Sequence, residues 1–215
     1  MNVDETNVQL HMDKGAGHLT LEACQLKRTP RSLSRQLSRG DVRSAATHVF
    51  AICDTPALQG MLPQLLVVSE RLVTKAECDA IRSSLPPTFY VLRQKKAWVN
   101  TDTMRLYAMY LRQHLSGIAA THRVILYLDV YKAHCAPQVL KAFGNRGILL
   151  CFIPASMTWA LQPCDTHAFA LYKTHLATSL QTTATELTAD GRISWSMLTR
   201  CIIETVECVI NTHMD

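Results

Sequence analysis

The segment that most constrains the fold is the run VILYLD at residues 124–129, followed five residues later by His134. Its apolar residues favour β-structure and end on a carboxylate, which predicts a buried strand that carries Asp129 at its exposed tip. A second acid, Asp165, follows another apolar run within LQPCD at residues 161–165. Because ligands gather at strand ends in α/β folds, we expect the two acids to share a site.

Composition is that of one globular domain. The chain has 215 residues, of which 48% are hydrophobic and 18% charged, enough for one sizeable core over residues 1–215 and too apolar for disorder. It has no membrane-length apolar run and no signal peptide at its start, so we expect an intracellular protein with no membrane partner. The eight cysteines form no CxxC pair, which favours buried free thiols over a zinc finger.

Positive charge is concentrated in one segment. The formal net charge is +5, and six cations lie between residues 27 and 43 beside a single acid, Asp41. These cations are Lys27, Arg28, Arg31, Arg35, Arg39 and Arg43. Guanidinium groups match phosphate oxygens, so the cluster predicts nucleic-acid binding. The alternative is a solvated loop with incidental charge.

Hydrophobic patterns predict strands first and then alternating helices and strands, which is a mixed α/β sheet flanked by helices. The expected strands are 2–6, 18–24, 47–53, 65–68, 89–92, 124–129 and 148–153, and the expected helices are 75–85, 101–115, 137–145, 166–181 and 194–210. Trp98 is expected in the core. Trp159, in the loop before Asp165, is a candidate for stacking on nucleic-acid bases.

The chemistry of the site depends on a third acid. Paired carboxylates are the oxygen ligands that Mg²⁺ and Mn²⁺ prefer, and a third from another strand would complete a two-ion site for phosphoryl displacement. The candidate is Asp4, within NVDET at residues 2–6. Spacing alone does not separate it from Asp13, Asp41, Asp54, Asp79 and Asp102.

Five segments, in order, resemble the catalytic domain of DDE-superfamily transposases of the mariner/pogo type. They are NVDET (2–6), FAICD with MLPQL (50–54 and 61–65), AWVN (97–100), LDVYKAH (128–134), and FIP with LQPCD (152–154 and 161–165). They are similar to the family's N-x-DET signature, its second hairpin with an LPQ turn, its GWV segment, its LDNAxxH box and its FLPP…LQPLD segment.

The resemblance implies an RNase H-like fold and metal-dependent DNA cleavage or strand transfer. Asp4, Asp129 and Asp165 would hold two Mg²⁺ (or Mn²⁺) ions. His134 would either position the scissile phosphate or serve as a structural histidine. DNA is the implied partner, the nucleus the implied location, and a homodimer a form in which such cores often act.

Departures from the family pattern keep other interpretations open. Val130 and Lys132 replace the family's Asn and Pro, and the chain begins three residues before Asp4. We therefore expect an N-terminally truncated domain without helix-turn-helix modules. One alternative is a catalytically silent, domesticated nucleic-acid-binding or scaffold domain. Another is an RNase H-like nuclease that acts on RNA hybrids.

Overall fold

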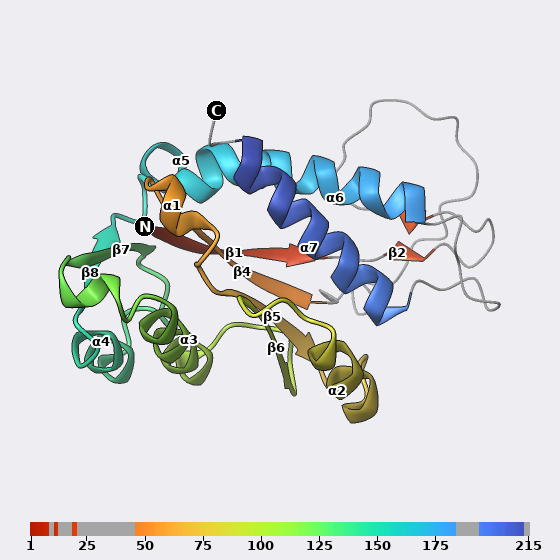
Figure 1. Ribbon diagram of the computed structural model, residues 1–215, viewed down its shortest axis with the longest axis horizontal. Coiled ribbons are helices and arrows are strands. Elements are labelled where there is room, and N and C mark those ends of the chain that lie inside the picture. Colours follow the sequence, from red (N-terminus) through yellow and green to blue (C-terminus); the bar gives the residue numbers. More distant parts are fainter. Residues whose placement is uncertain (9–10, 13–18, 21–45, 184–193, 213–215) are drawn as a thin grey trace.

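The computed structural model describes residues 1–8, 11–12, 19–20, 46–183 and 194–212. Its main sheet has six strands in the order β6-β5-β4-β1-β7-β8, and β2 pairs with β3 separately (Figure 1). The strands are β1 (Asn2–Val8), β2 (His11–Met12), β3 (Leu19–Thr20), β4 (Ala46–Ile52), β5 (Gln64–Ser69), β6 (Phe89–Gln94), β7 (Val124–Asp129) and β8 (Ile148–Ile153).

Helices cover both faces of this sheet, which confirms the expected α/β architecture. They are α1 (Pro56–Gln59), α2 (Lys75–Ser83), α3 (Thr101–His114), α4 (Pro137–Gly144), α5 (Thr158–Leu161), α6 (Phe169–Thr183) and α7 (Trp195–Thr212), with the short turns η1 (Ile118–Ala120) and η2 (Cys164–Ala168). One core joins α2, α6 and α7 to the sheet, and a second core joins α3 and α4 to the opposite face (Figure 1).

The strand directions place Asp4 and Asp129 side by side on neighbouring parallel strands. β4 runs antiparallel to β1 and β5, whereas β1–β7, β5–β6 and β7–β8 are parallel pairs. The carboxyl ends of β1, β7 and β8 therefore point the same way. Asn2 pairs with Tyr127, so the parallel register places Asp4 level with Asp129.

β1 differs most from its sequence-based prediction. The NVDET segment predicts a short strand with little to anchor it, yet β1 extends to Val8 and lies at the centre of the sheet. All seven of its residues pair with β4, and its first residue pairs with β7. The pairing partners are far along the chain, which is why local sequence did not indicate this position.

The prediction of a buried strand at 124–129 holds for only one face of β7. Val124, Leu126 and Leu128 are buried, but Ile125 and Tyr127 are about two-fifths exposed. Within the described residues, the α6–α7 core reaches β1, β4, β5 and β6 but includes no residue of β7 or β8.

No described helix has the length and apolar character needed to cross a membrane.

Candidate active site

Three elements deliver the three candidate acids. Asp4 lies in the middle of β1, Asp129 ends β7, and Asp165 is the second residue of the π-helical turn η2. Asp4 is 8% exposed, and its Oδ1 accepts a hydrogen bond of 2.8 Å from the backbone N–H of Glu5. The negative charges of Asp165 and Asp129 both act on Asp4, so the three carboxyls lie within electrostatic range of one another.

This crowding of negative charge changes how the acids titrate. Burial, followed by the charge of Glu5, raises the pKa of Asp4 from 3.8 to about 8, and Asp165 and Asp129 add to the rise. Burial also raises the pKa of Asp165, and the charge of Asp129 adds to this rise. The charge of Lys173 and a hydrogen bond with Asp4 lower the pKa of Asp165 but do not cancel the rise. Asp4 is therefore protonated at neutral pH unless a cation takes the proton's place.

The side chain of Asn2 joins the three elements that carry the acids. Its Nδ2 donates to the carbonyl of Tyr127 in β7 at 3.1 Å, and its Oδ1 accepts from the backbone N–H of Cys164 at 2.9 Å. Cys164 begins η2 and directly precedes Asp165. The bond to Cys164 is buried and the bond to Tyr127 is partly buried, and together they fix the start of η2 against β1 and β7.

His134 links Asp129 to β1 through a second carboxylate. Its Nδ1 lies 2.6 Å from Oδ1 of Asp129, and its Nε2 lies 2.8 Å from Oε1 of Glu5. Burial opposes the charged ring, but the bonds to Asp129 and Glu5 prevail and raise the pKa of His134 to about 10. The ring is thus an imidazolium that donates to both carboxylates.

The same contacts hold Asp129 in its ionised form. Burial acts to raise its pKa, but hydrogen bonds from His134 and from the backbone N–H of Tyr131 lower it overall. His134 is fully buried with both nitrogens engaged, so this geometry favours a role in positioning Asp129 over direct contact with a phosphate.

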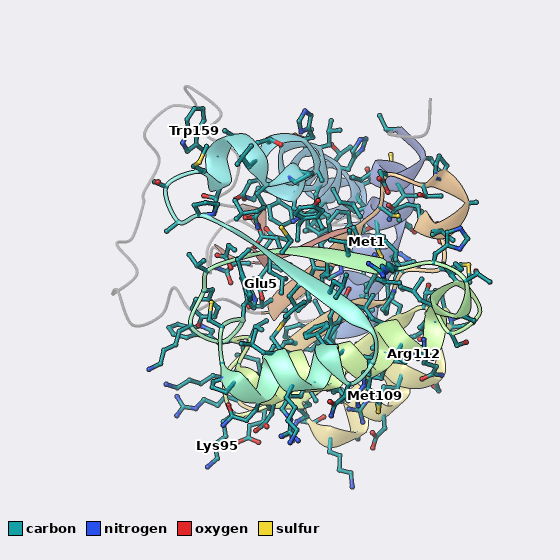
Figure 2. All side chains as sticks on the ribbon, turned by 90° about the vertical axis from the view of Figure 1, so that its left-hand side faces the viewer. Met1, Glu5, Lys95, Met109, Arg112 and Trp159 are labelled. Atoms are coloured by element: carbon teal, nitrogen blue, oxygen red, sulfur yellow. The ribbon has the colours of Figure 1, made fainter. Side chains whose placement is uncertain are left out.

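Sequence reasoning missed Glu5, which is labelled on the face shown in Figure 2. Side chains alternate along a strand, so Glu5 points away from the face that Asp4 occupies. That alternation was readable in NVDET, but the partner of Glu5 lies 129 positions away. Asn2 was quoted as part of the motif without a role, and its two hydrogen bonds now supply one.

The donor chemistry of the three acids fits a divalent cation. Carboxylate oxygens are the ligands that Mg²⁺ and Mn²⁺ prefer, and burial together with the neighbouring acids makes the ionised form of Asp4 unfavourable in the absence of a cation. Their present arrangement is not closed around an ion: within the described residues, no group of three or more His, Cys, Asp or Glu side chains is placed to hold one. Asp129 already has His134 on its Oδ1.

The predicted nucleic-acid contacts divide into two sets. The basic cluster Lys27, Arg28, Arg31, Arg35, Arg39 and Arg43 lies outside the described residues. Trp159 is in α5, 78% exposed, and its Nε1 donates to the carbonyl of Ser156 at 2.9 Å.

The expectation that Trp98 is a core residue is wrong, because its side chain is 62% exposed.

Comparison with known proteins gave one family match. The family model described as DDE superfamily endonuclease matches residues 52–213, which is more than half of the chain. The matched region contains Asp129, His134 and Asp165, and it begins after β1. No curated protein and no solved structure matched.

Proposed function

Because this chain belongs to the DDE superfamily endonucleases, we propose that it cleaves DNA phosphodiester bonds with divalent metal ions held by Asp4, Asp129 and Asp165. The observation that supports the proposal is the burial of Asp4 in hydrogen-bonding contact with Asp165 and within electrostatic range of Asp129. A buried carboxyl beside other acids is unfavourable for the fold alone, and such perturbed groups concentrate at functional sites.

The residues of the chain have separate tasks in this proposal. Asp4, Asp129 and Asp165 supply the metal-facing oxygens, while His134 orients the Asp129 carboxylate and Asn2 holds η2 in register. Bound Mg²⁺ or Mn²⁺ would activate a water or a 3′-hydroxyl and stabilise the departing oxygen. The proton on Asp4 must leave before that carboxylate can serve as a ligand.

A catalytically silent nucleic-acid-binding or scaffold domain is the second candidate. One observation favours it: the imidazolium of His134 already neutralises Asp129 from within the fold, at 2.6 Å. A carboxylate whose charge is already balanced by a counter-ion in the fold gains less stabilisation from a bound metal ion. This candidate predicts DNA binding that survives loss of the acids and is insensitive to chelation.

Nicking of supercoiled plasmid DNA separates the two candidates. The wild-type chain is incubated with Mg²⁺, Mn²⁺ or EDTA beside Asp129→Asn and Asp165→Asn. Asp102→Asn is the matched control, because Asp102 is an exposed carboxylate paired with Arg105 on α3. We expect metal-dependent nicking by wild type and control, and nicking at the EDTA level in both site variants. Equal nicking by all four proteins refutes the assignment of the acids.

A further inference from the structure

The segment between β6 and α3 presents two lysines and a tryptophan to solvent. Ala97 and Val99 are buried, 3% and 6% exposed, and anchor the segment in the fold. Trp98 lies between these anchors and is 62% exposed, and Lys95 and Lys96, directly before Ala97, are exposed as well. We refer to these three residues as the Lys–Trp rim.

Hydrogen bonds hold the rim in a defined shape. The side-chain amide of Gln94 donates to the carbonyl of Lys96 at 2.9 Å and to that of Trp98 at 2.5 Å. The hydroxyl of Ser69 donates to the carbonyl of Lys95 at 3.2 Å. Fixing the backbone in advance removes the entropy loss that a mobile loop would suffer on binding a ligand.

The rim is tied to the strand that carries the candidate active site. The hydroxyl of Thr47 donates to the carbonyl of Ala97 and lies 3.2 Å from Oδ1 of Asn7. Asn7 is two residues after Glu5 in β1 and shares its face of the strand. In Figure 2, Glu5 lies between Lys95 below and Trp159 above.

The lysines of the rim have no carboxylate partner among the described residues. The nearby acids are engaged elsewhere: Glu70 lies 3.9 Å from Arg93, and Asp102 lies 3.1 Å from Arg105. The ammonium of Lys96 is 5.8 Å from the ring centroid of Trp98. Cations beside an exposed aromatic face are the chemistry of surfaces that bind single-stranded nucleic acid, where phosphates meet the charges and a base stacks on the ring.

We propose that the Lys–Trp rim binds a single-stranded stretch of the nucleic acid that lies in the candidate active site, with a base on Trp98 and phosphates on Lys95 and Lys96. This inference rests on the proposed function, because it takes the substrate of that site to be nucleic acid. Beyond that function, the rim is the surface on which the nucleic-acid strand is held, and the bases bound there are unpaired.

Fluorescence anisotropy of labelled oligothymidylate, in EDTA, tests the rim without the chemical step. We expect Trp98→Ala to weaken binding about tenfold, the loss typical of one stacked base. The double variant Lys95→Gln/Lys96→Gln should lower the slope of log K against log salt by roughly 1.4, since each phosphate contact on a single strand contributes about 0.7. Arg112→Gln is the control, a cation on α3 that lies away from Lys95 in Figure 2.

The results separate the rim from the function on which it rests. If affinity for oligothymidylate and its salt slope are unchanged in the rim variants, the proposal that the rim binds a single strand is refuted. Metal-dependent nicking by the same variants would still support the proposed function. If wild type nicks duplex DNA but does not bind oligothymidylate, the single-strand assignment fails. If it neither binds nor nicks, both proposals fail. Thermal melts of each variant confirm that the fold is retained, since Trp98 and both lysines are exposed.

Discussion

The Nε2 of His134 lies 2.8 Å from Oε1 of Glu5, so a buried cation joins the end of β7 to the central strand across 129 positions of the chain. The other nitrogen of the ring meets Asp129 at 2.6 Å. Glu5 on β1 thus holds the His134 ring, and the ring in turn orients Asp129 at the end of β7.

Replacing His134 should destabilise the protein strongly. His134→Gln leaves Glu5 and Asp129 facing each other without the shared cation, and breaking a buried ion pair typically costs about 3–5 kcal/mol. Urea unfolding measures the loss. His114→Gln is the control: His114 is partly exposed and bonds only Tyr90 among the described residues, so it should lose about 1 kcal/mol. Equal losses would contradict a network at His134.

The Asp4 contribution to the stability of the metal-free protein should fall as pH rises. The folded chain keeps the Asp4 proton to about pH 8, whereas the unfolded chain loses it near 3.8. The folded state therefore binds more protons in this interval, and the Asp4 contribution is complete below pH 3.8 and lost as pH passes about 8.

The slope assignable to Asp4 is about 1.4 kcal/mol per pH unit. Other groups titrate in the same range: His48, whose pKa burial lowers from 6.5 to about 3, adds a rise of opposite sign below pH 6.5, and His134, whose pKa rises to about 10, adds a decline above it. The Asp4 contribution is therefore measured as the difference between wild type and Asp4→Asn in urea unfolding in EDTA below pH 6.5. Relative to wild type, Asp4→Asn should raise the slope of unfolding free energy against pH by about 1.4 kcal/mol per pH unit between about pH 4.5 and 6.5. The same slope in wild type and variant would show that Asp4 titrates normally.

Divalent ions should stabilise the fold through the acids. Mg²⁺ at about ten times its Kd stabilises by about 1.4 kcal/mol, visible as a rise in Tm. We expect Asp165→Asn to lose this rise and Asp102→Asn to keep it, since Asp102 lies exposed on α3. A rise retained in Asp165→Asn would place the ion elsewhere. Proton release on binding, followed by calorimetry in buffers of different ionisation enthalpy, would identify displacement of the Asp4 proton.

Asn2→Ala should release η2 from the sheet. It removes two hydrogen bonds, to Tyr127 and Cys164, and leaves their backbone groups unsatisfied, a loss of about 2–4 kcal/mol. Amide exchange at Cys164 gives the local measurement, and we expect its protection to disappear first. Asn145→Ala, at an exposed helix end, should change stability by less than about 0.5 kcal/mol. Full protection of the Cys164 amide in Asn2→Ala would refute this role for Asn2.

Sequence predicted elements well wherever the signal is local. Strands β7 and β8 have the expected bounds, Val124–Asp129 and Ile148–Ile153. Thr74 and Glu77 form a capping box at the start of α2, and Asn100 caps α3. Each of these signals is contained within a few consecutive residues.

The remaining features depend on contacts between distant segments. The central place of β1 and the role of Glu5 require partners more than a hundred positions away, which no local pattern indicates. Trp98, expected in the core, is 62% exposed. Its exposure follows from the alternation of a segment whose buried positions are Ala97 and Val99.

The central position of β1 has a consequence for how the chain folds as it is made. β1 can pair with β4 early, but its other neighbour, β7, emerges from the ribosome only after residue 124. Contacts of such sequence separation form slowly, and until then the free edge of β1 is open to strands of other chains. Substitutions at residues 2–8 should therefore change the yield of folded protein and its tendency to aggregate during synthesis, in addition to the stability of the finished molecule.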